Sequence, residues 1–473
     1  MRWHSMRVDH DAPWVLITVH KQARELDSKL WLAATLIRDG FNVVIGRTGA
    51  LRALAERLPR GIYMDFRFVG TRKPVFEIYR AAGHKVVCFD EEATSFHDKD
   101  HYRTNLVSPE ALSLTEAAFC WGDFHADVLR SALPEAMHGL VQITGHPRFD
   151  MLRHPLRGAY QALADELRAT YGRFFLVNSS TGGWILEGQV DARWRSYVDR
   201  GIVRDVPTEK EKFYAQYHYR LDKHRYMVAL IEAAARALPD HKIIVRPHFT
   251  EREASWLASF ETVPENVLIL HSHSSVPWML AAEAVIHNSC TTGTEAFLAE
   301  VPVISYRPVK HPDHEPYLPN ALSLEVEDEA EAVDLLRAVA AGERDRLQVG
   351  RAEREAIFDR MMYGRTGPFA SVRIAAVLRD IAFTAPDSPE RLRRLLKKGA
   401  RTQPLRAIKR AIDMARGRQR SRGTQETEIT CSTMRKKMQS ILAHCDAHHP
   451  PIVIREVAGE VFVVVRQDSL RAR

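Results

Sequence analysis

The sequence predicts an α/β protein with two Rossmann-like domains that face a cleft, each built on a parallel sheet, and a basic C-terminal extension. Short runs rich in Val and Ile alternate with longer segments of helical periodicity. Helical segments end at Gly40 and Gly83, and a strand-like run follows each glycine at once. The length of 473 residues also fits two or three domains better than one.

The first domain is predicted over residues 1–160. Its expected strands are 14–19, 41–46, 61–66, 84–90, 117–122 and 140–145, with helices at 29–40, 50–58 and 74–83. The second domain is predicted over residues 161–385. Its expected strands are 173–180, 241–248, 266–273, 285–289 and 302–306, with helices at 227–238, 276–284 and 292–300. Within it, residues 185–215 are polar and irregular, which indicates an insertion or an active-site loop.

The C-terminal part changes character. Residues 386–423 are predicted to form a basic linker or amphipathic helix, and residues 424–473 a small appended α+β element that ends in a β-hairpin around Gly459. Residues 391–422 carry thirteen Lys and Arg and one Asp, a net charge of +12, whereas the whole chain carries +7. This local charge favours an anionic membrane surface as partner, with a solvated linker as the alternative. Nucleic acid is not expected, because no aromatic residues are interleaved.

Composition excludes several classes of protein. No apolar run approaches the roughly 20 residues that span a bilayer, and the N-terminus does not resemble a signal peptide. The five cysteines are scattered without CxxC spacing, so neither a disulfide framework nor a metal site is predicted. We therefore expect a cytoplasmic protein without a cofactor, peripheral on the inner face of the cell membrane.

The stretch HNSCTTGTEA, residues 287–296, combines small hydroxyl residues with a glycine at a strand-to-helix turn. Such turns lie at the carboxyl edge of a parallel sheet, where backbone N–H groups and hydroxyls bind phosphate. The alternative is simple capping of the helix, although one hydroxyl would suffice for that. The last acid of the stretch would bind a ribose or serve as a first-turn acid. The predicted nucleotide-sugar-binding residues here are His287, Asn288, Ser289, Thr291, Thr292, Gly293 and Glu295.

Two further segments are predicted at the same edge. The strand IIV delivers Arg246 and His248 at its carboxyl end, one βαβ unit before the hydroxyl-rich stretch, and both side chains can meet an anion. Residues 177–183, VNSSTGG, form another hydroxyl–glycine loop after a strand, and they could face the cleft.

Three acids end a strand of the first domain. Asp90, Glu91 and Glu92 form either a solvated turn or a catalytic group in which one carboxylate deprotonates an acceptor hydroxyl. Farther along, TGHPRFD is predicted to be architectural, with an ion pair between Arg148 and Asp150 and Arg148 as a further site contact.

Taken in order, DEE, FCWGDFHADVL, TGHPRFD, VNSSTGG, RPH and HNSCTTGTEA resemble the bacterial surface carbohydrate biosynthesis proteins. This family makes capsule and lipopolysaccharide and belongs to the GT-B glycosyltransferases related to Kdo transferases. The resemblance covers about residues 14–345. It implies that His248 contacts the donor phosphate, that the hydroxyl-rich stretch holds the nucleotide, and that the acids at 90–92 lie by the acceptor. Phe249 and Ala93 depart from the family's RPHP and DEEG motifs.

The resemblance implies a metal-independent transferase that moves a sugar from a nucleotide-sugar, such as a CMP-Kdo-like donor, to a surface polysaccharide or lipid-linked glycan. Glu91 or Glu92 would act as base if the reaction inverts, and Asp191 is a candidate nucleophile if it retains. Three alternatives remain open. They are a CDP-polyol phosphotransferase, a nucleotide-sugar epimerase or hydrolase, and a non-catalytic scaffold of an assembly complex.

Overall fold

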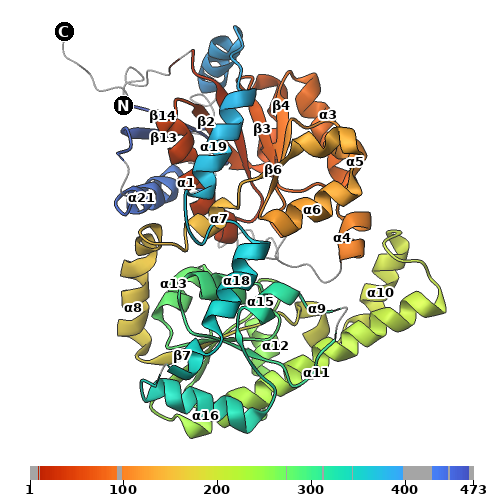
Figure 1. The fold of residues 1–473 in the computed structure, drawn as a ribbon, viewed down its shortest axis with the longest axis vertical. Coiled ribbons are helices and arrows are strands. Elements are labelled where there is room, and N and C mark those ends of the chain that lie inside the picture. The colour runs from red at the N-terminus through yellow and green to blue at the C-terminus, as the bar shows by residue number, and fades with distance from the viewer. Residues whose placement is uncertain are drawn as a thin grey trace, which may run out of the picture. The chain divides into compact units, whose positions relative to one another are not determined.

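The computed structural model describes residues 9, 11–92, 99–272, 274–311, 314–343, 345–397, 429–445 and 448–467. The chain divides into two compact units (Figure 1). The first unit combines residues 1–93 and 99–159 with the C-terminal residues 359–473, and the second is formed mainly by Tyr160–Phe358.

The first unit is built on an eight-stranded sheet with the order β13-β14-β2-β1-β3-β4-β5-β6. The strands are β1 (Trp14–Val19), β2 (Asn42–Arg47), β3 (Ile62–Asp65), β4 (Lys85–Cys88), β5 (Ala117–Cys120), β6 (Val141–Ile143), β13 (Ile452–Ala458) and β14 (Val461–Arg466). Strands β1 to β6 are parallel, whereas β14 is antiparallel to β2 and β13 is antiparallel to β14.

Helices of the first unit include α1 (Gln22–Arg38), α2 (Thr48–Arg52), α3 (Lys73–Ala81), α4 (Lys99–Asn105), α5 (Pro109–Leu112), α6 (Asp123–Ala132), α7 (Pro147–Asp150), α19 (Ala370–Ile381) and α21 (Cys431–Leu442). Asp150 joins three of them, because it accepts hydrogen bonds from Trp31 Nε1 at 3.1 Å and from the N–H groups of Ala370 and Ser371 at 2.7 and 2.9 Å. The carboxylate of Asp150 therefore connects α7 to α1 and α19. These hydrogen bonds, and not the predicted ion pair with Arg148, fix its position.

The second unit has a six-stranded, fully parallel sheet with the order β12-β11-β10-β7-β8-β9. Its strands are β7 (Phe174–Asn178), β8 (Lys242–Arg246), β9 (Val267–Ile269), β10 (Val285–His287), β11 (Val303–Tyr306) and β12 (Leu324–Val326). Its helices are α8 (Gln161–Tyr171), α9 (Gly183–Leu186), α10 (Val190–Asp199), α11 (Pro207–Ala237), α12 (Glu253–Leu257), α13 (Ser275–Ala281), α14 (Thr292–Leu298), α15 (Tyr317–Ala321), α16 (Glu329–Ala340) and α17 (Asp345–Gln348), and α18 (Arg351–Met361) leads back to the first unit.

Both sheets reverse their direction of winding once. In the second unit, successive strands run outward from β7 on one side and from β10 on the other, so the reversal lies between these two strands. Among the parallel strands of the first unit, the reversal lies between β1 and β3. Ligands of doubly wound sheets bind outside the carboxyl ends of the strands at such reversals. The predicted α/β class with two parallel sheets is confirmed, and a cleft between the units stays a prediction.

The division of the chain differs from the predicted ranges at its C-terminal side. The second unit begins where expected, but the chain rejoins the first unit at residue 359 rather than forming one domain to 385. Residues 429–467 are not a separate element, because β14 pairs with β2 and α21 packs on α1. The hairpin joins the first sheet because β2 would otherwise be an edge strand with unpaired N–H and C=O groups, and the apolar strand β14 covers this edge. The predicted hairpin around Gly459 is confirmed.

Close approach of the two strands requires a glycine in β2. A Cβ atom on Gly46 would lie 2.8 Å from the carbonyl oxygen of Glu460 and 3.1 Å from Cα of Val461. Every residue of Val461–Val465 is buried. The C-terminal hairpin is therefore part of the core of the first unit.

Two other expectations need correction. Residues 185–215 are not irregular, since they include the second half of α9, all of α10 and the start of α11, which runs for 31 residues. In the basic segment, residues 391–397 continue a helix of the first unit in which Leu392 and Leu395 are each 3% exposed. These two leucines face the protein interior and not a membrane. The rest of the segment, residues 398–422, lies outside the described residues.

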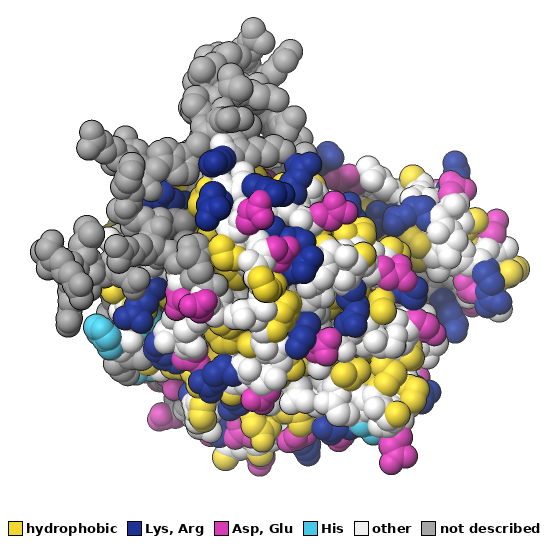
Figure 2. All heavy atoms as spheres, turned by 90° about the horizontal axis from the view of Figure 1, so that it is seen from above, with side chains coloured by type: hydrophobic (Ala, Val, Ile, Leu, Met, Phe, Trp, Pro, Cys, Tyr) yellow, Lys and Arg dark blue, Asp and Glu magenta, His cyan; other side chains and the backbone are white. Residues whose placement is uncertain are grey.

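On the face drawn in Figure 2, basic and acidic side chains lie interspersed over the described surface. Among the helices of the described residues, none has both the length and the apolar character needed to cross a membrane.

The role of the hairpin in the core yields a test. Phe462 in β14 is fully buried, so the substitution Phe462→Ala should cost about 3–5 kcal/mol of unfolding free energy. Arg466→Ala at the exposed end of the same strand should change stability by less than about 0.5 kcal/mol. Urea unfolding followed by circular dichroism measures both. Equal stability of Phe462→Ala and the unsubstituted protein would show that the hairpin is an appendage.

Candidate functional site

The carboxyl ends of β7, β8 and β10 lie level with one another in the second unit. In register, Asn178 at the end of β7 pairs with Arg246 of β8 on one side and with His287 of β10 on the other. The loops that follow are the three predicted segments VNSSTGG, RPHF and HNSCTTG. The structure therefore brings these segments together at the reversal of the sheet.

A single buried carboxylate joins two of these loops. Glu251 is 4% exposed, and its Oε1 accepts hydrogen bonds from Ser179 Oγ at 3.0 Å and from the N–H of Gly182 at 2.7 Å. Its Oε2 accepts from the N–H of His248 at 3.1 Å and from Trp256 Nε1 at 2.7 Å. Glu251 thus fixes the loop after β7 against the loop after β8, and sequence reasoning missed it.

Glycine permits this close approach. A Cβ on Gly183 would lie 1.9 Å from the carbonyl oxygen of Thr250, so no other residue fits between the two loops. Gly182 has a φ of +99°, in the region that favours glycine. The two glycines of VNSSTGG therefore serve the backbone geometry of the site.

His287 supports the site from within and does not face a ligand. It is fully buried, Nδ1 lies 3.3 Å from the N–H of Cys290, and Nε2 lies 2.8 Å from Ser323 Oγ. Burial, helped by the charges of Lys223 and Arg307, lowers the pKa of His287 to about 3, so the ring is neutral. The predicted binding role of His287 is replaced by a structural one, because the ring fixes the turn that follows β10.

Gly293 is explained by the same ring. A Cβ at this position would lie 2.4 Å from His287 Nε2 and 3.0 Å from the carbonyl oxygen of Pro319. The glycine therefore lets α14 pack on His287. The expectation that it lets a phosphate approach is not supported by its surroundings.

Asn288 and Ser289 also lie in the interior. Asn288 Nδ2 donates to the carbonyl oxygen of Tyr306 at 2.7 Å, and Ser289 Oγ accepts from Asn320 Nδ2 at 3.0 Å. Ser289 has a φ of +57°, a left-handed conformation that costs a non-glycine residue about 1–3 kcal/mol. Such conformations cluster at functional sites, and here a polar network holds the residue in place.

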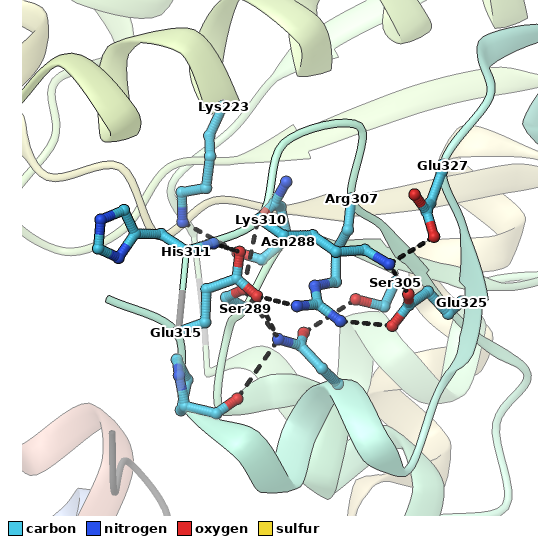
Figure 3. Close-up of polar contacts among 12 residues, drawn as sticks. Lys223, Asn288, Ser289, Ser305, Arg307, Lys310, His311, Glu315, Glu325 and Glu327 are labelled. Atoms are coloured by element: carbon cyan, nitrogen blue, oxygen red, sulfur yellow. Dashed lines mark hydrogen bonds and ion pairs between the residues drawn. The ribbon is translucent and has the colours of Figure 1, made fainter. Parts of the chain in front are cut away.

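Figure 3 shows this network around Glu315. The carboxylate of Glu315 accepts from Arg307 Nη2, from the N–H of His311 at 3.2 Å and from Asn320 Nδ2 at 3.3 Å. It also accepts from Tyr219 Oη of α11. It thereby links α11 to the segment after β11, and through Asn320 it supports Ser289.

None of the hydroxyls in HNSCTTGTEA caps α14. Thr291 occupies the N-cap position without a side-chain hydrogen bond to the helix, and Thr292 Oγ1 donates instead to Cys290 Sγ at 3.1 Å. Thr291 and Thr292 are partly exposed, whereas the preceding four residues of the stretch are buried. The simple capping alternative is therefore not what the structure shows.

Two other predicted residues lie at the carboxyl end of β8. His248 and Arg246 are partly exposed at the end of β8, where Arg246 Nη2 donates to the carbonyl oxygen of Ser272 at 3.2 Å. Burial lowers the pKa of Arg246 to about 10, and the charge of Glu295 opposes this shift. Glu295 is 3% exposed and acts as a neighbouring countercharge, which leaves it poorly placed for a ribose.

Helix α11 contributes two further cations that sequence reasoning missed. Lys223 is 5% exposed, and its Nζ lies 3.4 Å from the carbonyl oxygen of Asn288. Burial, helped by the charge of Arg220, lowers the pKa of Lys223 to about 8. Arg220 lies beside Gly182, whose added Cβ would be 3.7 Å from Arg220 Nη1. Their spacing of three residues on one helix was a usable signal, but the helix was expected to begin only at residue 227.

The predicted catalytic acids lie in the first unit in three different environments. Glu91 is buried and pairs with Lys29 at 2.5 Å, and its Oε2 lies 3.2 Å from Nε2 of His146. Asp90 is buried too and accepts from Tyr102 Oη at 2.5 Å, and burial raises its pKa. Both acids are thus engaged inside the unit and do not face an acceptor. Glu92 is the exposed member of the three, with 45% of its side chain accessible.

The remaining predictions concern a nucleophile and metals. Asp191 lies on α10 and accepts a hydrogen bond from Tyr214 of α11. Among the described residues, no group of three or more His, Cys, Asp and Glu side chains is arranged to hold a metal ion. Metal independence of the reaction stays a prediction.

No protein-family model and no curated protein matches the chain. Among solved structures, it is similar to the wall teichoic acid polymerase TagF, with 12% identity, 81% of this chain and 91% of that chain covered, and a TM-score of 0.44. It is also similar to S. aureus MnaA with UDP (10% identity, 78% and 96% covered, TM-score 0.45) and to Anabaena Alr3699/HepE with UDP-glucose (11%, 78% and 99%, 0.40). These identities and TM-scores are low, so the function proposed for this chain rests on its own residues.

Glu251 offers a test of the site's construction. In Glu251→Gln, an NH2 group replaces one of the two carboxylate oxygens, each of which now accepts two hydrogen bonds. The NH2 group would face hydrogen-bond donors, so the substitution should lower the unfolding free energy by about 2–4 kcal/mol. Glu253→Gln, two residues away and exposed on α12, should stay within about 0.5 kcal/mol of the unsubstituted protein. Urea unfolding compares the two variants. Equal stabilities would contradict the view that Glu251 joins the loops.

Proposed function

We propose that the second unit binds a nucleotide-sugar at the carboxyl edge of β7, β8 and β10, and that the protein is a glycosyltransferase. One observation supports this most strongly. The point where the sheet reverses coincides with the point where two hydroxyl–glycine loops meet Arg246 and Lys223. A ligand with phosphate groups fits both the position and the charge.

The accessible groups suggest which residues touch the phosphates. The partly exposed side chains at this edge supply hydroxyl, imidazole and guanidinium donors, and they belong to Ser180, Arg220, Arg246, His248, Thr291 and Thr292. Of these, His248 is held in place twice. Its N–H donates to Glu251, and its Nδ1 lies 2.8 Å from Thr250 Oγ1. The buried residues His287, Asn288, Ser289 and Gly293 then act as positioning residues for the turn.

A bound anion would stabilise the charged forms of Arg220 and Lys223 most. Each is in the vicinity of the other's like charge, and burial lowers the pKa of both groups. A bound phosphate would compensate both charges in a region of low dielectric, where such an interaction is strong. In the reaction, the acceptor hydroxyl attacks the anomeric carbon and the bond from that carbon to the phosphate oxygen breaks. The electron pair leaves with the phosphate, and these cations would stabilise the charge that develops there.

The acceptor hydroxyl must lose its proton when it attacks, and Glu92 is the exposed one of the three predicted acids. Burial alone would raise the pKa of Glu92, but Arg24, Arg67 and Arg148 outweigh this effect and lower it below its ordinary value. A carboxylate of low pKa is a weak general base. This favours an electrostatic role for Glu92, and the proton then passes to the leaving phosphate, which becomes more basic as the bond breaks, or to solvent water.

The acceptor in this proposal is a surface polysaccharide or lipid-linked glycan, as the resemblance of the sequence motifs implies. Residues 391–422 are proposed to attract an anionic membrane surface through their charge. Leu392 and Leu395 would take no part in that contact, because both are buried in the first unit.

Nucleotide binding can be measured by thermal unfolding with CMP, CDP, UDP, GDP and CMP-Kdo. A ligand at about 100 times its dissociation constant adds about 2.7 kcal/mol of stability. We expect one base to stabilise the protein and Arg246→Gln or Thr291→Val/Thr292→Val to remove the effect. Thr170→Val, on the exposed face of α8, is the matched control and should keep it. If none of the five ligands stabilises the unsubstituted protein, the nucleotide-sugar function is wrong.

The lowered pKa of Lys223 predicts a pH dependence of binding. Only the protonated amine attracts phosphate, so affinity for the stabilising nucleotide should fall as pH rises through about 8. The decline should approach about tenfold per pH unit. Lys223→Arg keeps its charge throughout this range and should bind with constant affinity from pH 7.5 to 9. Calorimetric titration at each pH gives the comparison, and the same slope in both proteins would refute a role for Lys223.

A further inference from the structure

An aromatic cluster borders the site in the second unit. The loop after β7 leads directly into α9, whose second residue is Trp184, and α9 packs against α10 and α11 (Figure 1). The indole ring of Trp184 stacks on Phe213 of α11, with ring centroids 5.4 Å apart and an angle of 23° between the planes. Tyr197 of α10 meets the same phenylalanine edge-on, with centroids 5.6 Å apart. The cluster thus connects the loop after β7 to the two helices that follow it.

The rings of the cluster are fixed within the protein. Phe213 is buried beneath Trp184, and the guanidinium group of Arg193 lies over the ring of Tyr197, 4.8 Å from its centroid. One face of Trp184 and one face of Tyr197 are therefore occupied. Because the rings are held in this way, their polar ends have defined positions.

These polar ends are available to a ligand. Neither Trp184 Nε1 nor Tyr197 Oη makes a hydrogen bond with any residue that the structure describes, and both side chains are partly exposed. Solvent reaches both atoms. Tryptophan and tyrosine suit binding sites because their rings pack against protein while an N–H or O–H group stays in water.

Both polar ends lie close to Arg220 of α11. Trp184 Nε1 and Arg220 Nη1 are each 3.7 Å from the point where a Cβ atom of Gly182 would lie, so they flank the same glycine. Burial lowers the pKa of Arg220, and Tyr197 is among the groups near enough to oppose this shift. Within the described ranges, Arg220 makes neither an ion pair nor a hydrogen bond. The three polar groups therefore lie together at the loop after β7, and none of them has a partner there.

A sugar bonded to a phosphate presents the groups that this arrangement can bind. In a nucleotide-sugar the sugar is attached directly to a phosphate, so its hydroxyls lie close to the phosphate oxygens. If Arg220 pairs with the phosphate, donors beside Arg220 can reach those hydroxyls. An indole N–H donates a hydrogen bond and a phenol both donates and accepts, which suits hydroxyl groups.

We propose that Trp184 Nε1 and Tyr197 Oη bind hydroxyl groups of the sugar, and that they help to determine which sugar the second unit accepts. This inference rests on the proposed function, because Arg220 must hold the phosphate for the sugar to reach them. A site with such polar groups rejects a sugar that leaves them unpaired. Phe213 acts as a positioning residue, since it holds the indole ring and does not touch the ligand.

Glycosyl phosphates test these contacts without a nucleobase. The full chain is titrated with methyl phosphate and with α-glucosyl, α-galactosyl, α-mannosyl and N-acetyl-α-glucosaminyl phosphate, and phosphorus NMR gives the dissociation constants. Two added hydrogen bonds should make at least one glycosyl phosphate bind about tenfold more tightly than methyl phosphate. Trp184→Phe, which keeps an aromatic ring on Phe213, and Tyr197→Phe should each reduce this preference about three- to tenfold. Neither should change the affinity for methyl phosphate.

Tyr214→Phe is the matched control. It removes a hydroxyl from the same pair of helices, but that hydroxyl donates to Asp191, so the preference should be kept. The inference is wrong if no glycosyl phosphate binds more tightly than methyl phosphate, or if the preference survives in Trp184→Phe/Tyr197→Phe. An equal loss of methyl phosphate binding in these variants would also contradict it, because the side chains would then act on the loop and not on the sugar.

Failure of the proposed function is recognised separately. Free CMP, CDP, UDP and GDP lack the sugar, so Trp184→Phe and Tyr197→Phe should leave their binding unchanged, whereas Arg246→Gln should remove it. Weaker binding of a free nucleotide in Trp184→Phe would place the nucleoside at these side chains and would refute the sugar contact. A preference for a glycosyl phosphate without binding of any nucleotide would refute the nucleotide-sugar function and support the sugar contact.

Discussion

The buried carboxylate of Glu251 is the interaction on which the geometry of the second unit's site depends. Three donors from two loops and a fourth from α12 converge on its two oxygens, and two of the four are backbone N–H groups. The loop after β7 can therefore adopt its glycine-rich conformation only where the loop after β8 presents this side chain. His248 and Ser180 take their places at the edge of the sheet as a consequence.

The buried carboxylate of Glu315 likewise joins separate segments, on the β10 side of the reversal between β7 and β10. Glu315 accepts hydrogen bonds from Arg307, Asn320 and the N–H of His311 (Figure 3), and from Tyr219 as well. Asn320 in turn supports Ser289 in its left-handed conformation. The hydroxyl-rich stretch after β10 is thus shaped from behind by buried polar groups, while its threonines remain partly exposed. Buried hydrogen-bond networks of this kind hold a site in shape before any ligand binds.

Sequence patterns predicted the alternation of strands and helices, and with it the edge at which the three hydroxyl and cation segments meet. Residue types alone could not distinguish side chains that contact a ligand from side chains that hold the loops in place. His287 and Gly293 are of residue types that often bind phosphate. Here the buried ring of His287 leaves no room for a Cβ atom at position 293, so packing accounts for the glycine. Glu251 and Lys223 stood in segments without a motif, and their roles come from hydrogen bonds to residues 65 to 72 positions away in the sequence. The pairing of β14 with β2 joins residues more than 400 apart, which no local pattern can indicate.

The most direct test of nucleotide binding at this edge is hydrogen–deuterium exchange of the full chain with and without saturating CMP, CDP, UDP or GDP. We expect slower exchange of backbone amides in residues 178–183, 246–251 and 288–294 with the nucleotide that binds, and unchanged exchange at the hairpin of β13 and β14. No protection with any of the four nucleotides, or protection that leaves all three loops unchanged, would contradict a nucleotide site at the carboxyl ends of β7 and β10.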